Sequence, residues 1–346
     1  MKSLKFLAAF LILLSGSALK SQTDLLKDPE VIWIGETSII FNPDLNRSEL
    51  REKLKIGGFT QVLKKVVPND KIRSFDENNE HLSLANILLQ SKQKVYHDSL
   101  LQKQMNSADL KKALNYMDTI ITFDPETFKE KVTIQPAVAD AYSISGFKMR
   151  VQVYYHKKDM MYRTVPLAIA PVLFTGKILY WMPMSASAVT ELSNNNVNWA
   201  VRLAYTCPLK GNNIKEIKKS DKYSFEYFFE KINEKKITAY VPFDILGAGQ
   251  NQLINKDEVS MIGATVDTII TVDPTTKNEI KTVVLNYLFP EDISQVRFVQ
   301  DWYWDDQKQQ LFYRHLGFAP LMNRYDQNGN FLNSGPMFYI REKGVE

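Results

Sequence analysis

The stretch DTIITFDPETFKEK at residues 118–131 returns, closely similar, as DTIITVDPTTKNEI at residues 267–280, 149 positions further along. In the second copy an Asp-Pro pair separates two runs rich in β-branched residues. Pro274 fixes φ for the second turn position and Asp273 can hydrogen-bond the turn backbone, so this copy predicts a β-hairpin. A repeat at a constant offset indicates a repeated structural unit. The chain is therefore expected to contain two related halves.

The similarity extends beyond this stretch at the same offset. Residues 150–172 align without a gap with residues 299–321, and residues 178–181 align with 337–340 after ten extra residues in the second copy. In this alignment Tyr154 and Tyr155 fall on Tyr303 and Trp304. Upstream, the helix-like residues 84–96 parallel residues 228–240, and Trp33 parallels Trp199. We predict a first unit at residues 30–183 and a second at residues 195–342.

Each unit is expected to be α+β, with one helix followed by an antiparallel β meander. In residues 224–236, Ser224 can cap a helix whose apolar residues recur at roughly helical spacing. Residues 296–321 then alternate with a period of two and predict another hairpin, and Asn328-Gly329 favours a third turn. The alternation puts one set of residues on one strand face, Val296, Phe298, Trp302 and Trp304, and another on the opposite face, Arg297, Val299, Asp301 and Tyr303.

Residues 1–21 have the layout of a secretory signal peptide. A basic start precedes an apolar run from Phe6 to Leu14, and small residues follow at 15–18. The run is shorter than the about 20 residues that a membrane-spanning helix needs. Because no later segment reaches that length, we expect an exported chain without a transmembrane segment in its mature form.

The charge and cysteine content exclude some classes of function. The formal net charge is only +4, without the clustering of Lys and Arg that nucleic-acid binding requires, so no nucleic-acid partner is expected. Cys207 is the single cysteine. It cannot form an intramolecular disulfide, and its apolar surroundings favour a packed small side chain over a nucleophile or an intersubunit cross-link.

The titratable residues show no clear catalytic or metal-binding pattern. The four histidines, at positions 81, 97, 156 and 315, have no spacing typical of metal ligands. Asp305 and Asp306 could form a carboxylate pair for acid–base chemistry, but a hairpin tip usually carries solvated charges. We therefore predict no catalytic, cofactor or metal site, and the chain is not expected to be an enzyme.

Aromatic residues carry the strongest remaining signal. In the segment DWYWDD, Trp302 and Trp304 fall on one strand face and Tyr303 on the other, so both faces need cover. Core packing explains either face. Two aromatic faces on one strand, together with unpaired strand edges, also suit a sheet that another subunit covers.

The second copy resembles the GldN/PorN family of the type IX secretion and gliding-motility machinery of Bacteroidetes. The resemblance is specific over residues 267–340, through DTIITVDPTT, VQDWYWDDQKQQLFYRHLGFAPL and YDQNGNFLNSGPMFYI. In the first copy, DTIITFDPETFKEKV is similar to the same family, and the resemblance extends over residues 118–181.

The resemblance implies a non-enzymatic structural subunit of a periplasmic ring at the inner face of the outer membrane. Its implied partners are a GldK/PorK-like outer-membrane lipoprotein and the periplasmic domain of a GldM/PorM-like motor protein. Competing hypotheses are a periplasmic ligand- or glycan-binding module and an exported hydrolase. The candidates for protein interaction, whose alternative role is local folding, are Trp302, Tyr303, Trp304, Arg314, His315, Phe318 and Pro320.

Overall fold

The structure is a computed structural model that describes most of the chain. The described residues are 24–41, 61–65, 83–186, 197–220, most of 231–241, 253–254, 265–286, 293–325 and 330–343. The predicted signal peptide at 1–21, the helix cap at Ser224 and the Asn328-Gly329 turn lie outside these residues.

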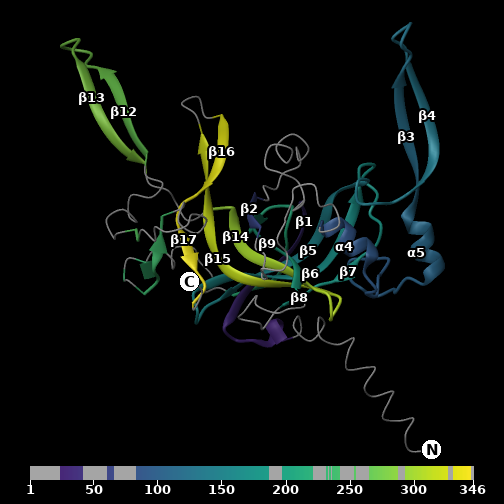
Figure 1. The fold of residues 1–346 in the computed structure, drawn as a ribbon. Helices are drawn as coiled ribbons and strands as arrows, with labels where there is room; N and C mark the ends of the chain where they lie inside the picture. The colour runs from purple at the N-terminus through teal and green to yellow at the C-terminus, as the bar shows by residue number, and fades with distance from the viewer. Residues whose placement is uncertain are drawn as a thin grey trace, which may run out of the picture.

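Two β-sheets form the body of the protein (Figure 1). The first sheet has the order β10-β1-β5-β6-β7. Its strands are β10 (Lys215–Lys219), β1 (Val31–Phe41), β5 (Ile144–His156), β6 (Met161–Leu173) and β7 (Met182–Pro183). All of its strand pairs are antiparallel.

The second sheet has the order β11-β17-β15-β14-β9-β2, and β16 and β8 also pair with β15. Its strands are β11 (Ala239–Tyr240), β17 (Tyr339–Arg341), β15 (Gln310–Tyr325), β14 (Gln295–Asp305), β9 (Val197–Pro208), β2 (Gln61–Lys65), β16 (Phe331–Pro336) and β8 (Ser185–Ala186). The predicted hairpins at β14–β15 and β15–β16 are confirmed.

Two further hairpins stand apart from these sheets. The first hairpin consists of β3 (Asn115–Phe123) and β4 (Glu130–Val138), and the second hairpin of β12 (Thr265–Val272) and β13 (Glu279–Asn286). Each pairs only within itself among the described strands. Figure 1 shows both projecting from the body, at opposite ends and toward the same side.

The two main sheets share one hydrophobic core, because each contributes its inner face to the same cluster of buried residues. Phe41 of the first sheet meets Trp302 of the second edge-on, with ring centroids 5.1 Å apart. Tyr162 and Phe318 make a similar contact at 5.5 Å. Such aromatic pairs contribute beyond the area they bury, so they hold the sheets face to face.

The strand registers of the two halves agree at the 149-residue offset. Tyr155 lies opposite Tyr162 in the β5–β6 pair, and Trp304 lies opposite Leu311 in the β14–β15 pair. The two projecting hairpins also share one register, since Phe123 pairs with Glu130 as Val272 pairs with Glu279.

Local irregularities repeat as well. The β5–β6 pair shifts register between residues 150 and 151, and the β14–β15 pair shifts between 299 and 300. Met160 and Gln309, at equivalent hairpin turns, both have positive φ, at 57° and 51°. Bulges and turns of this kind fix register, so the sequence repeat preserves the backbone geometry and not only the hydrophobic pattern.

The outer parts of the alignment agree less closely. Trp33 lies opposite Tyr155 and Trp199 opposite Trp304, which matches the predicted equivalence of the two tryptophans. At the other end the registers pair Ile169 with Met182 and Phe318 with Ile340. Met182, and not Trp181, is therefore the structural counterpart of Ile340. The boundaries 30–183 and 195–342 stay a prediction.

Each half gives one short strand to the sheet of the other half. β2, from the first half of the chain, pairs with β9, and β10, from the second half, pairs with β1. Both pairs are antiparallel and both contain a register shift. This reciprocal exchange links the two sheets through the backbone as well as through the core.

The predicted α+β fold, with a helix opening each unit, is wrong because the chain is mostly β. In the first half, α4 covers only Leu84–Gln90, whereas the sequence predicted a helix to Tyr96. Ser91, which ends the helix, is extended, and Tyr96 exchanges hydrogen bonds of 2.8 and 2.9 Å with Trp181. Pairing with a distant segment thus overrides local helix propensity.

Helix α5 (Ser107–Leu114) precedes the first hairpin. Asn106 and Asp109 form a capping box at its start, which satisfies two backbone N–H groups. Among the described residues, no helix is long and apolar enough to cross a membrane.

Candidate interaction site

The tip of the first hairpin is a structured loop centred on Asp124. Its side chain accepts hydrogen bonds from the backbone N–H groups of Glu126 and Thr127, at 3.0 and 2.8 Å. The N–H of Phe128 bonds to the carbonyl of Asp124 at 2.8 Å, and Phe128 adopts a positive φ of 54°. The backbone donors lower the pKa of the Asp124 carboxyl, that of Thr127 most strongly. These contacts fix the loop without help from the body.

The second hairpin ends in the same loop. Asp273 accepts from the N–H groups of Thr275 and Thr276 at 2.7 and 3.0 Å, and Lys277 has a positive φ of 60°. Backbone hydrogen bonds, first that of Thr276, lower the pKa of Asp273. The predicted Asp-Pro hairpin and the role given to Asp273 are confirmed.

The first hairpin is anchored firmly at its base. Lys177 Nζ donates to the carbonyl oxygens of Ala113 and Asn115, both at 2.8 Å, where α5 runs into β3. The N–H of Ala139 bonds to the carbonyl of Leu114 at 2.8 Å and joins the ends of the hairpin. Tyr116 packs against the main core. The hairpin therefore leaves the body in a defined direction.

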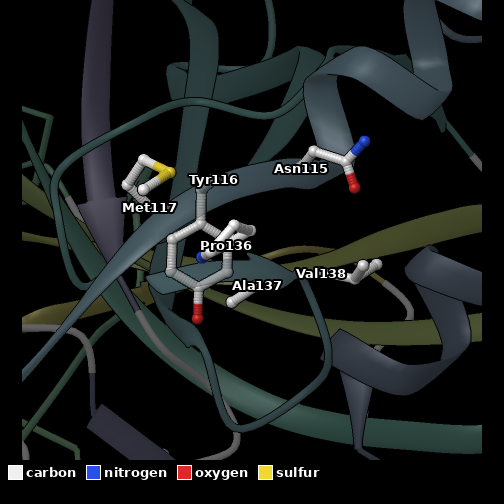
Figure 2. A pocket seen from close by; sticks show the side chains of 6 residues that line it. All are labelled: Asn115, Tyr116, Met117, Pro136, Ala137 and Val138. Carbon is white, nitrogen blue, oxygen red and sulfur yellow. The ribbon is translucent and has the colours of Figure 1, made fainter. Parts of the chain in front are cut away.

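A hollow of about 500 Å³ lies at this base. Figure 2 shows the side chains that line it, which come from both strands of the hairpin: Asn115, Tyr116, Met117, Pro136, Ala137 and Val138. The lining contains no Asp, Glu, His, Lys or Arg side chain. All six lining residues belong to β3 and β4, so the hollow is part of the surface of the first hairpin.

One face of the first hairpin is apolar and open to solvent. Directly paired residues share a face, so the register places Ile121 with Val132 and Phe123 with Glu130. Ile121 is 54% exposed and Phe123 62%. The exposed apolar side chains on this face are Met117, Ile121, Phe123, Val132, Ile134 and Val138. We call this set the apolar face.

The opposite face is more polar. It carries Asp118, Thr122, Lys131 and Gln135, with Ile120 among them. Thr122 Oγ1 donates to the carbonyl of Lys131 at 3.3 Å across the strands. The hairpin is thus amphipathic, but nothing in the described part of the chain covers its apolar side.

This exposure is unusual for a two-stranded hairpin. Such hairpins are marginally stable in water unless they pack against something, and contiguous exposed apolar surface with open strand edges marks a place of association. Phe128, at the tip, is 80% exposed. The first hairpin is therefore the best candidate for an interaction site on the described surface.

The second hairpin exposes a related but different surface. Ile270 is 56% exposed, and Val272 and Ile280 are also exposed. Ile270 pairs with Lys281, whereas its counterpart Ile121 pairs with Val132. The equivalent face of the second hairpin therefore carries a cation where the first hairpin carries a valine.

The candidates chosen from the sequence lie elsewhere. Trp302, Trp304 and Phe318 are fully buried on the inner face of the second sheet, and Tyr303 is buried on its outer face. Tyr303 stacks on Phe312 with ring centroids 5.6 Å apart. Pro320 is also buried. The predicted distribution of these side chains over two faces is confirmed. A role in partner contact stays a prediction.

Arg314 takes part in a buried ion cluster on the outer face of the second sheet. Asp301 is buried and accepts from Arg202 Nε at 2.7 Å and from Arg314 Nη2 at 2.8 Å. Two guanidinium groups thus satisfy one buried carboxylate. In the first sheet, Glu36 receives Arg150 Nε and Nη2 at 2.8 and 2.9 Å.

His315 belongs to a polar network that joins the two sheets. Its Nε2 donates to the carbonyl of Thr164 at 2.6 Å, and its Nδ1 accepts from Gln300 Nε2 at 3.1 Å. Gln300 also donates to Thr164 Oγ1 at 2.9 Å and accepts from Trp302 Nε1 at 2.8 Å. Burial lowers the pKa of His315 to about 4, although the Thr164 carbonyl opposes this shift. His315 is therefore neutral at physiological pH.

Asp305 and Asp306 stabilise a hairpin turn. Asp305 Oδ1 accepts from the N–H of Lys308 at 2.9 Å, and Asp306 Oδ1 accepts from Trp304 Nε1 at 2.9 Å. The two carboxylates are thus engaged separately. Their contacts support the structural alternative over acid–base chemistry.

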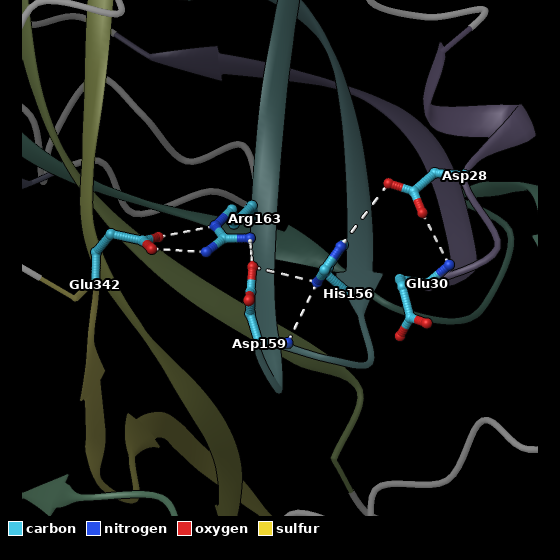
Figure 3. Close-up of polar contacts among 6 residues, drawn as sticks. All are labelled: Asp28, Glu30, His156, Asp159, Arg163 and Glu342. Carbon is cyan, nitrogen blue, oxygen red and sulfur yellow. Dashed lines mark hydrogen bonds and ion pairs between the residues drawn. The ribbon is translucent and has the colours of Figure 1, made fainter.

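A chain of charges connects segments that are distant in sequence, as Figure 3 shows. Arg163 on β6 binds Glu342 through two contacts, of 2.8 and 2.6 Å, and Asp159 at 2.8 Å. Burial alone would lower the pKa of Arg163, but the two carboxylates raise it above its usual value. His156 lies between Asp159 and Asp28, at 3.2 and 3.8 Å. This chain fastens the C-terminal strand to the first sheet.

Neither metal ligation nor thiol chemistry finds support in the described residues. No group of three or more His, Cys, Asp or Glu residues there could hold a metal ion. Cys207 is a free, fully buried thiol in the main core, and burial raises its pKa well above the usual value. The interpretation of Cys207 as a packed side chain agrees with this position.

The sheets and the hairpins together define a mostly β protein with two exposed, repeated hairpins. Comparison with known families extends this description. The family model described as "Gliding motility associated protein GldN" matches residues 193–343. The prediction of the GldN/PorN family is confirmed, and residues 193–343 belong to it. No curated protein matches the chain.

The family match over residues 193–343 bears on function. It associates the chain with gliding motility and type IX secretion and suggests a place in the cell envelope. Proteins of this family are structural components of the gliding apparatus, which is consistent with a role that is not enzymatic. The matched segment contains the second hairpin, while the similar first hairpin lies outside it.

Proposed function

We propose that the chain is a structural subunit of a periplasmic ring in the type IX secretion and gliding apparatus, and that it binds an outer-membrane lipoprotein of the GldK/PorK type. In this proposal the periplasmic domain of a GldM/PorM-like motor protein is a further partner. The observation that carries it is the pair of matched hairpins whose exposed apolar residues lack cover within the described part of the chain.

The division between core and surface supports a scaffold role. The two sheets share one core and are also joined by the exchanged strands and the cross-sheet network of His315, which suits a rigid body. The apolar surface outside the core is concentrated on the hairpins, where docking leaves the body undisturbed. The family match to gliding motility provides independent support.

A ligand- or glycan-binding module is less well supported. That hypothesis needed tryptophan and tyrosine as stacking platforms, but Trp302, Tyr303 and Trp304 are buried in the body. An exported hydrolase would need converging titratable groups in a cavity. The hollow at the base of the first hairpin contains no acidic, basic or histidine side chain.

The test is recovery of the assembly from cells. The full chain with a C-terminal tag is purified from periplasmic and outer-membrane fractions, its partners are identified by mass spectrometry, and the eluate is imaged by negative stain. The proposal predicts a lipoprotein partner together with ring- or arc-shaped particles. A monomer without partners would refute it. A tagged chain that lacks residues 115–138 is purified in the same way. Partners that the full chain recovers and this variant does not are those whose binding depends on the first hairpin.

A further inference from the structure

We propose that the apolar face of the first hairpin docks on the equivalent face of the second hairpin of a neighbouring copy of this chain. The inference rests on the proposed ring subunit and assigns the contact between copies to named strands, β3–β4 of one copy and β12–β13 of the next. The contact is heterologous, because two different surfaces of the same chain meet in it.

The placement of the hairpins allows this contact to repeat. They leave opposite ends of the body and project toward the same side (Figure 1). Copies set side by side in one orientation therefore bring the first hairpin of one against the second hairpin of the next. Each copy uses both hairpins once, and such head-to-tail contacts build rings or open arrays.

The matching backbones make the two hairpins suitable partners. Phe123 pairs with Glu130 and Val272 with Glu279, so each hairpin has the same register next to its tip. The loops share an Asp-centred hydrogen-bond pattern. Two strand pairs of equal geometry can stack face to face at the roughly 10 Å spacing of packed sheets.

Charge favours the mixed pair over two identical first hairpins. Within residues 115–123 and 130–138, Glu130 is the only charged residue that the register places on the apolar face. The equivalent face of the second hairpin carries Glu279, the counterpart of Glu130, and also Lys281. When both hairpins point the same way, the mixed pair therefore places one cation beside the two carboxylates, whereas two first hairpins would bring two Glu130 side chains together without a cation.

The exposed area is of the size that such a contact needs. Six apolar side chains lie on the apolar face. If each exposes on the order of 100 Å², the face offers roughly 600 Å², not far below the about 800 Å² per partner of a standard interface. Each copy makes this contact at both of its hairpins, so the two contacts support one another in a closed assembly.

The test uses cysteine cross-linking in the intact chain. Ile121→Cys and Ile270→Cys are introduced together and separately, and cells that produce the full chain are treated with a short bismaleimide. Native Cys207 is buried and does not compete. The matched control is Thr122→Cys with Thr271→Cys, which places exposed thiols one residue away on the opposite faces.

The expected result is a ladder of dimers, trimers and larger products from the double variant. Each single variant and the Thr122→Cys/Thr271→Cys control should give little product. A dimer from Ile121→Cys alone would mean that two first hairpins meet, and it would overturn the inference. Absence of a ladder from the double variant would also overturn the inference. If the same cells still yield the lipoprotein partner and rings, the hairpin contact is wrong while the proposed function stands.

A charge exchange provides an independent check. Lys281→Glu in the cysteine pair should lower the ladder yield roughly threefold, as expected for loss of an exposed ion pair. Adding Glu130→Lys should restore the yield by reversing both charges. Equal yields in all three proteins would contradict the placement of Glu130 beside Lys281.

Discussion

His315 predicts a specific pH dependence of stability. It lies half-buried in the network that joins the two sheets, and its pKa falls from 6.5 to about 4 on folding. Between these values the unfolded chain binds more protons than the folded chain, so the free energy of unfolding must fall as the pH is lowered. The stabilisation is complete above about pH 6.5 and is lost between 6.5 and about 4.

The size of the effect follows from the two pKa values. For a folded-state pKa of about 4 and an unfolded-state value of 6.5, linkage predicts a loss of about 2 kcal/mol between pH 7.5 and pH 5. The assay is urea unfolding of the mature chain at a series of pH values, for wild type and His315→Gln. The variant should be less stable at neutral pH, and its stability should fall about 2 kcal/mol less on acidification. Parallel curves for the two proteins would refute the assignment.

Three further predictions concern the fold. Asp301→Asn should lower the free energy of unfolding by about 3 kcal/mol, because it removes the buried charge that two arginines share, and urea unfolding measures this loss. Gly317→Ala should cost about 1–3 kcal/mol, since a Cβ there would collide with the carbonyl oxygen of Ile340, and thermal unfolding would detect it. Asp124→Ala should speed amide exchange at the tip of the first hairpin while the melting temperature of the body stays unchanged, because its contacts are local.

Features that depend on local chemistry could be predicted from the sequence. The Asp-Pro loop at Asp273 follows from side-chain hydrogen bonds within four residues. The division of β14 into two faces follows from alternation alone. The constant 149-residue offset in the sequence corresponds to equivalent residue pairs in β5–β6 and β14–β15. These predictions held because neighbouring residues along one strand determine them.

The helices and the exchanged strands depend on distant segments. The helix stops short of Tyr96 because Tyr96 pairs with Trp181, which is far away in sequence. The pairing of β2 with β9 also joins separate halves of the chain. No local pattern specifies which of two similar sheets a short strand will join, so the exchange could not be read from periodicity.

The candidate site shows the same limit. Alternation along β14 leaves both strand faces in need of cover, which predicts a contact role for Trp302 and Tyr303, but the chain itself buries both. The prediction does not include Ile121 and Phe123, although both lie in the repeated stretch at residues 118–131. Alternation predicted a hairpin, but whether another segment covers one of its faces is not specified by any local pattern. Within the described part of the chain the three-dimensional arrangement leaves that face open.

The most direct test of the assembly role is imaging of particles purified from cells whose first hairpin is altered on one face. Ile121→Glu with Ile134→Glu places two charges on the apolar face, and Thr122→Glu with Thr133→Glu is the control on the opposite face. The account predicts that the first pair abolishes rings and arcs in negative-stain images while the chain stays folded, and that the control retains them. Intact rings from the Ile121→Glu/Ile134→Glu chain would contradict it.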